Sequence, residues 1–324
     1  MTIHSNGGID GTAGANCDEF GMQGRAILGI IGNVGPEADE LLQRLIRLEA
    51  TAHGARKDQD YLPMIVVKNP EITDRTLAIF EGGKSPAVGI VESCRILESC
   101  CSYLAALPSN TSHFFKNEYQ SKTAVYVIDI IAATMEAIQR LGATRAGLLA
   151  TTSTIATGLY DKKENTSGSV FIAPKPEVQE KFVQSAIYGS LDPSGRHDRR
   201  NADGLKSGRE DMAVERLSAA IRTLVEQEGL NVFIAGCTEV SIVIEKLQSA
   251  FTQCRFIDPM KCLAQRAYSL TVAVEQLLTA NENIEPIDLE AALKDQGLVA
   301  GYVAGKIRAH WRRVNPDLQI EAVA

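Results

Sequence analysis

Short apolar runs alternate with helical patterns along most of the chain. Several of these runs end at small polar or turn-forming residues, such as Gly, Asn-Pro or Thr-Thr. The predicted strands lie at residues 27–31, 64–67, 103–107, 125–128, 146–150, 170–173, 232–235 and 256–257. Strands that alternate with helices are typical of a parallel sheet with helices on both faces. The pattern therefore predicts an α/β fold.

The segment at residues 36–53 has a clear helical pattern. Pro36 suits the first position of a helix, and the apolar side chains that follow recur at helical spacing. They predict one apolar face formed by Leu41, Leu45 and Leu48, flanked by Leu42 and Ile46. Further helices are expected up to residue 141, over 176–188 and through a long C-terminal region.

The strand and helix rhythm restarts near residue 125, which predicts two α/β domains. Each half also has an apolar strand that ends in a small polar tripeptide, at residues 109–111 and 236–238. A chain of 324 residues is long enough to bury two cores.

Two segments do not follow the alternation of strands and helices. Residues 1–25 have the composition of a flexible leader, and the polar, glycine-rich residues 189–210 predict an inserted surface loop.

Composition narrows the choice of partners. The formal net charge of −7 argues against nucleic acid, which binds to basic surfaces. No apolar run approaches the 18 residues of a membrane span, so no membrane partner is expected. The N-terminus lacks the basic start and apolar run of a signal peptide, and we therefore expect a cytoplasmic protein. The seven cysteines are irregularly spaced and form no metal-ligand pattern.

Four polar segments follow predicted strands, where open α/β sheets bind their ligands. They are residues 32–37, 69–76, 108–113 and 236–239. The glycines of the first segment allow backbone N–H groups to face an anion, but a tight turn that binds nothing is the simpler interpretation. In the second, Arg75 is placed to bind a carboxylate with two parallel hydrogen bonds, or to form a weak surface pair with Asp74.

The other two segments carry candidate nucleophiles or bases. Ser109 stands at a strand end, either facing a cleft or capping the next helix. Cys237 stands between a strand and a predicted helix, where the helix dipole favours a thiolate; a buried, inert cysteine is the alternative.

Together, and in this order, the four segments resemble the motifs of the aspartate/glutamate racemase superfamily. Its pattern runs Ile-Gly-Gly-Met-Gly-Pro-Glu-Ala, Asn-Pro-x-Ile-x-Asp-Arg-Thr, Pro-Cys-Asn-Thr-x-His and Gly-Cys-Thr-Glu, and the resemblance covers about residues 26 to 275. It implies two pseudo-symmetric flavodoxin-like domains with an active site in the cleft between them. The first domain would comprise 26–123 plus 257–324, with a helical C-terminal extension, and the second 124–256 with the loop at 189–210.

The resemblance also implies a racemase that works without pyridoxal phosphate or any other cofactor. Two bases would flank the Cα atom of an amino-acid substrate, one removing a proton and the other delivering one. Cys237 matches the second base, and residue 109 stands in the position of the first. The remaining substrate-binding residues implied in this way are Asn33, Val34, Arg75, Asn110, Thr111, Thr151, Thr238 and Glu239, with Lys162 or Lys163 for a side-chain carboxylate. The superfamily is commonly dimeric, so a homodimer is expected.

The chain departs from the family pattern at the first base, which is Ser109 instead of cysteine. A hydroxyl is a far poorer base than a thiol at pH 7. The serine is then an engineered substitution, a natural variant that exchanges its proton through neighbours or water, or the sign of a lost racemisation. Asn33 and Val34 also replace the Gly-Met of the turn, and Asp39 a residue that is usually Thr, so aspartate or glutamate is not assumed. The alternatives are a sister isomerase or decarboxylase of a small dicarboxylate, and an amino-acid-binding protein.

Overall fold

Two parallel four-stranded sheets form the framework of the protein. The computed structural model describes residues 25–161, 168–190, 203–280 and 295–314. The first sheet has the strand order β2 (Met64–Lys68), β1 (Leu28–Gly32), β3 (Leu104–Ala106), β4 (Tyr126–Ile128). The second has the order β6 (Val170–Ile172), β5 (Arg145–Leu148), β7 (Val232–Ile234), β8 (Arg255–Ile257). The predicted α/β fold is therefore confirmed.

The two sheets have the same topology. In each, the first strand of the sheet pairs with the second on one side and with the third on the other, and the fourth pairs with the third. All six pairings are parallel, so the carboxyl ends of the four strands of a sheet lie at one edge. This repeated order is the flavodoxin-like arrangement, and it confirms the predicted pseudo-symmetry.

Strand β4 corrects one detail of the predicted division. The boundary at residue 124 assigned this strand to the second domain, but β4 pairs with β3 of the first sheet in the register Leu104↔Tyr126. The chain passes to the second sheet only through α5 (Ile130–Leu141). Alternating strands and helices look the same within a sheet and between sheets, so the pattern alone could not locate this crossover.

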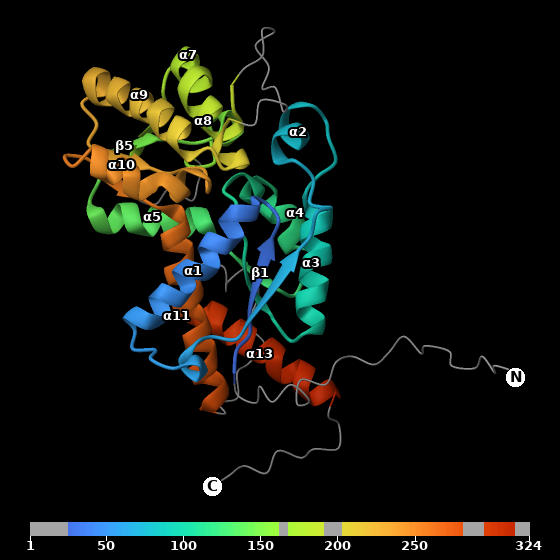
Figure 1. Ribbon diagram of the computed structural model, residues 1–324. Helices are drawn as coiled ribbons and strands as arrows, with labels where there is room; N and C mark the ends of the chain where they lie inside the picture. The colour runs from blue at the N-terminus through green and yellow to red at the C-terminus, as the bar shows by residue number, and fades with distance from the viewer. Residues whose placement is uncertain (1–24, 162–167, 191–202, 281–294, 315–324) are drawn as a thin grey trace, which may run out of the picture.

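Helices cover both sheets (Figure 1). Around the first lie α1 (Pro36–Ala52), α3 (Ala87–Ser99) and α4 (Lys116–Gln120), whereas α2 (Arg75–Phe80) lies beyond the tips of the strands, beside the second half. Around the second lie α6 (Thr152–Ala156), α7 (Pro176–Val178), α8 (Ser185–Tyr188), α9 (Glu210–Glu228) and α10 (Ile244–Ala250). A π-helical turn, η3 (Gln179–Gln184), joins α7 to α8, so the predicted helix at 176–188 is continuous but not a regular α-helix.

The C-terminal helices join the two halves of the molecule. Helix α11 (Pro259–Thr279) contacts α1 of the first half, α5 and α13 (Gln296–Val314). One apolar cluster contains strand residues of both sheets, including Ile30 and Ile234, together with Leu263 of α11. Figure 1 shows α11 running from the upper half of the molecule down beside α1. The two sheets therefore share a continuous core.

The buried face of α1 differs from the predicted one. Leu42 and Ile46 are fully buried against α11 and the first sheet, whereas Leu48 is 44% exposed. The predicted helix is confirmed, but its apolar face is centred on Leu42 and Ile46. Within the described residues, no helix is both long and apolar enough to cross a membrane.

This difference can be tested in α1. We expect Ile46→Ala to lower the free energy of unfolding by about 2–5 kcal/mol, because it leaves a cavity in the shared core. Leu48→Ala should change it by less than about 0.5 kcal/mol, because that side chain is half exposed. Urea unfolding of both variants measures the difference, and equal losses would contradict the assigned face.

Candidate functional site

A small, narrow cavity lies between the two halves. Its volume is about 20 Å3, which is room for about one water molecule. It is lined by Val34, Arg75, Thr76, Ser109, Asn110, Thr111, Thr151, Tyr188, Lys206, Cys237, Thr238 and Glu239. An amino acid can therefore enter only after some of these groups move apart.

The lining residues follow the carboxyl ends of strands from both sheets. Val34 follows β1 and Ser109 follows β3, while Thr151 follows β5 and Cys237 follows β7. In Figure 1 the arrow of β1 points toward the half that carries α9. Ser109 and Cys237 thus come from equivalent third strands, and the fold brings these two distant residues to one cavity.

Arg75 is held at the cavity by backbone carbonyls. It is the first residue of α2, and its Nη2 donates to the Val34 carbonyl at 2.9 Å and its Nη1 to the Thr73 carbonyl at 3.3 Å. The Asp74 carboxylate instead caps α2, accepting from the backbone N–H groups of Thr76 and Leu77. A guanidinium has five N–H donors, so donors remain for a ligand.

Ser109 is held by its neighbour Ser112. The Ser109 Oγ accepts hydrogen bonds from the Ser112 hydroxyl at 2.8 Å and from the Ser112 N–H at 3.3 Å. Because a hydroxyl oxygen accepts two hydrogen bonds and donates one, Ser109 has its own proton left to donate. The serine is both a local cap and a lining residue of the cavity, so the two interpretations drawn from the sequence are compatible.

Cys237 lies in a chain of hydrogen bonds with Glu239 and Lys206. The Cys237 thiol donates to Glu239 Oε2 at 2.9 Å, and the Lys206 ammonium donates to Glu239 Oε1 at 2.5 Å. The Thr238 hydroxyl also donates to Oε2, at 3.2 Å, so its proton is directed to Glu239 in this arrangement. Glu239 is 4% exposed and Cys237 7%.

Burial and charge set the protonation of this chain. Burial and the adjacent Glu239 carboxylate raise the pKa of the Cys237 thiol well above its usual value. Burial opposes the charge of Glu239, but the Lys206 ammonium and the Cys237 thiol lower the pKa of Glu239 to about 2. Burial likewise opposes the charge of Lys206, yet Glu239 raises the pKa of that ammonium.

The thiol is therefore protonated at rest. Of the two interpretations drawn from the sequence, the thiolate at a helix start is the one that this arrangement disfavours, because a short 3-10 turn, Val240–Val243, follows Cys237 and a carboxylate lies beside the sulfur.

The turn after β1 contacts this carboxylate. Gly35 has a φ of 155°, and a Cβ atom there would lie 3.0 Å from Glu239 Oε1. Asn33 adopts a left-handed conformation with a φ of 62°, and its N–H donates to the buried Asp39 carboxylate at 3.1 Å. Val34 lines the cavity and Asn33 does not. Asp39 thus shapes the turn whose glycine packs against Glu239.

Hydroxyl groups connect the two halves around the cavity. Thr111 Oγ1 lies 2.9 Å from Thr154 Oγ1, which lies 3.0 Å from Thr151 Oγ1. On α2, Thr76 Oγ1 lies 3.1 Å from Ser153 Oγ and 3.2 Å from the Tyr188 hydroxyl. These contacts hold α2 and η2 (Thr111–Phe115) of the first half against α6 and α8 of the second.

Sequence reasoning missed three of the lining residues. Thr76 ends the second of the four motif segments, and Tyr188 ends the predicted helix at 176–188, but neither was among the predicted site residues. Lys206 lies in η4 (Leu205–Ser207), at the end of the predicted polar insertion. The buried Leu205 between Gly204 and Gly208 was the available signal that this part of the insertion packs inward. Lys162 and Lys163 lie outside the described residues.

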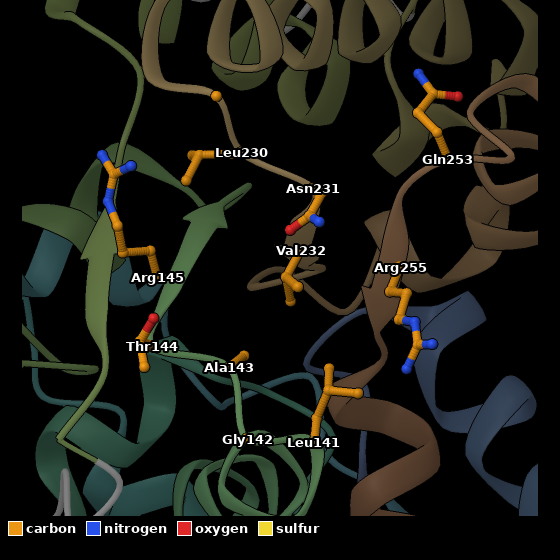
Figure 2. A pocket seen from close by; sticks show the side chains of 11 residues that line it. Leu141, Gly142, Ala143, Thr144, Arg145, Leu230, Asn231, Val232, Gln253 and Arg255 are labelled. Atoms are coloured by element: carbon orange, nitrogen blue, oxygen red, sulfur yellow. The ribbon is translucent and has the colours of Figure 1, made fainter.

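A larger hollow lies at the opposite edge of the second sheet (Figure 2). Its volume is about 480 Å3, and it is lined by residues around the amino ends of β5, β7 and β8, among them Arg145, Asn231 and Arg255. Arg145 forms a salt bridge there with Glu228, with 3.1 Å between Nη2 and Oε2. Helices α5 and α9 end at Gly142 and Gly229 on its rim, and helix C-termini repel anions. The small cavity, at the carboxyl edges, is therefore the candidate active site.

Comparisons with known proteins agree with this assignment of the fold. The profile of the Asp/Glu/hydantoin racemase family matches residues 31–267. The broad specificity amino-acid racemase RacX of Bacillus subtilis is 24% identical over 254 residues, which span 77% of this chain and all of that protein.

Solved structures share the fold. The aspartate racemase of Picrophilus torridus has a TM-score of 0.61 and 24% identity, covering 76% of this chain and 94% of that one. An aspartate racemase homologue from Pyrococcus horikoshii OT3 has a TM-score of 0.56 and 21% identity, covering 76% and 98%.

The fold and the site define an α/β protein with two four-stranded parallel sheets and a small cavity between them. Because the family profile covers more than half of the sequence, the chain belongs to the Asp/Glu/hydantoin racemase family, whose racemases do not use pyridoxal phosphate. The resemblance inferred from the four motifs is thereby confirmed.

The Glu239 contacts predict a dependence of stability on pH. A carboxylate whose pKa falls from 4.5 to about 2 on folding stabilises the fold above pH 4.5, and this stabilisation is lost as the pH falls from 4.5 toward 2. Glu239→Gln should therefore be less stable than the wild type at pH 7, and the difference should shrink below pH 4.5. Denaturant unfolding at several pH values measures it. As a control, Glu40→Gln, in an exposed pair with Lys68, should change little at any pH.

Proposed function

We propose that the protein is an amino-acid racemase that exchanges the Cα proton between two faces without a cofactor. The observation that carries the proposal is that Ser109 and Cys237, from equivalent strands of the two sheets, line one cavity together with Arg75. If the substrate carboxylate binds Arg75, the substrate Cα atom would lie between the Ser109 hydroxyl and the Cys237 thiol. Family membership supports the same reaction class.

In this mechanism Cys237 acts as the base after it transfers its proton to Glu239. That transfer is unfavourable at rest, because Lys206 holds Glu239 ionised and the thiol protonated. A substrate carboxylate that attracts Lys206 would make Glu239 a better proton acceptor. The thiolate would then take the Cα proton, forming an S–H bond as the C–H bond breaks. Substrate binding thereby creates the base.

Ser109 acts as the acid on the other face. It would give its hydroxyl proton to Cα, and the oxygen left behind accepts two hydrogen bonds from Ser112. An alkoxide is costly even with two donors, because a serine hydroxyl is a weak acid. Inversion should therefore be slower than proton removal by Cys237.

The charge of the cavity favours an acidic amino acid. Arg75 and Lys206 are cationic and Glu239 is anionic, so these three groups carry a net charge of +1. Aspartate and glutamate carry a net charge of −1, which complements it. The relative RacX is described as broad in specificity, so neutral amino acids belong in the same substrate panel. Asn110, Thr111 and Thr151 would position the substrate by hydrogen bonds.

The domain division and the assembly are parts of the same proposal. With β4 in the first sheet, we place the change of domain in α5 rather than at residue 124. We also propose a homodimer, as in other members of the superfamily, which sedimentation of the purified protein would test. A cytoplasmic location is consistent with this substrate class.

Hydrogen exchange in D2O tests the reaction directly. One enantiomer of the substrate should exchange its Cα proton for deuterium and keep its configuration. We expect the rate of this exchange to exceed the rate of inversion at least about tenfold, because only the Cys237 face exchanges readily. The other enantiomer should gain deuterium only as it inverts. Proton NMR and chiral chromatography measure the two rates. In the control variant Cys237→Ala, both exchange and inversion should be abolished. Binding without exchange for every amino acid would instead indicate a binding protein.

Restoring the cysteine at position 109 tests the second base. Ser109→Cys should accelerate inversion at least about tenfold, because a thiol gives up its proton far more easily than a hydroxyl. Exchange at the Cys237 face should change much less. Cys254→Ser, at a buried cysteine away from the cavity, is a matched control for a Ser–Cys change. An unchanged ratio of inversion to exchange would contradict the assigned role of residue 109.

A further inference from the structure

One buried amide of the cavity has an unused donor. Asn110 is 2% exposed and lines the cavity. Its Oδ1 accepts a hydrogen bond from the Tyr160 hydroxyl at 2.6 Å, whereas its Nδ2 has no partner among the described residues. Buried donors are almost always satisfied, so one left open at a ligand cavity indicates an atom that the ligand contacts.

Tyr160 holds the other side of this amide from the second half of the molecule. It is 1% exposed, and its ring packs edge-on against Phe171 at 5.9 Å between centroids. Burial raises the pKa of the Tyr160 hydroxyl far above its usual value, so the hydroxyl keeps its proton. It donates that proton to Oδ1, and because an amide is planar, Nδ2 points to the opposite side.

We propose that Tyr160 is a positioning residue, which fixes the amide of Asn110 so that Nδ2–H donates to the substrate oxygen that gains charge when the Cα proton leaves. This inference rests on the proposed racemase function. A rotated amide would instead present the Oδ1 acceptor to that oxygen and repel it. Without the Tyr160 hydroxyl, no side-chain hydrogen bond to Asn110 from the described residues would select between the two orientations of the amide.

Tyr160→Phe tests the role while preserving the packing of the ring. Because the donor matters most when charge has developed, we expect kcat to fall at least about tenfold and KM to change less than about threefold. The matched control is Tyr119→Phe, because Tyr119 is also fully buried and its hydroxyl has no partner among the described residues. That variant should keep the kcat and KM of the wild type.

A double-mutant cycle shows whether Tyr160 acts through Asn110. Asn110→Ala should lower kcat by about a hundredfold, the usual loss for a removed donor to a developing oxyanion. In that background Tyr160→Phe should change kcat less than about twofold, since the amide is already gone. The proposal would be overturned if the kcat losses of the two variants multiplied in the double variant. It would also be overturned if Tyr160→Phe left kcat unchanged or altered KM alone.

The wild-type reaction separates this inference from the proposed function. If the wild type is active and Tyr160→Phe equals it, the racemase stands and the positioning role is wrong. If the wild type binds aspartate without exchange at Cα, the racemase is wrong, and the same cycle is measured as Kd by calorimetry. If the losses of binding free energy at positions 160 and 110 are coupled, Tyr160 positions Asn110 toward a bound carboxylate. If these losses are additive, the positioning role is wrong. A wild type that neither binds nor turns over any amino acid overturns both.

Discussion

The ion pair between Lys206 and Glu239 is the interaction on which the site depends. Glu239 is buried where a free carboxylate would be costly, and the ammonium at 2.5 Å is what keeps it ionised. The ionised carboxylate in turn accepts hydrogen bonds from the Cys237 thiol and from the Thr238 hydroxyl. It also limits the turn after β1, because Gly35 leaves just enough space beside it. One charge thus orders residues from three segments of the chain.

The fold supplies this interaction through two repeated sheets and one shared core. The identical strand order places equivalent loops at facing edges, so Ser109 and Cys237 meet although they lie far apart in sequence. Helix α11 packs against elements of both halves, and the hydroxyl contacts of Thr76 and Thr111 join the halves again near the cavity. The geometry of the site is therefore set by contacts on two sides of the cavity.

Much of this arrangement could be predicted from the sequence. The apolar runs located the strands, and the polar residues that follow them gave most of the cavity. The sheet to which β4 belongs could not be predicted, because a strand's periodicity does not indicate its partner. Lys206 was missed because its role depends on a contact with Glu239, 33 residues later. The sequence left the state of Cys237 open between a thiolate and a buried thiol, because it does not show the buried carboxylate that lies beside the sulfur and raises the pKa of the thiol.

The small volume of the cavity has a kinetic consequence. A molecule larger than water meets a binding-competent shape only while the protein is transiently open. The observed affinity of any ligand is then weaker than its intrinsic affinity by the fraction of time spent open. Association should also be slower than diffusion allows, as is usual when binding requires a conformational change. Compounds chosen by their fit to the small cavity would be matched to a conformation that does not bind the ligand. Inhibitors of this protein are better sought by screening for slow-onset inhibition.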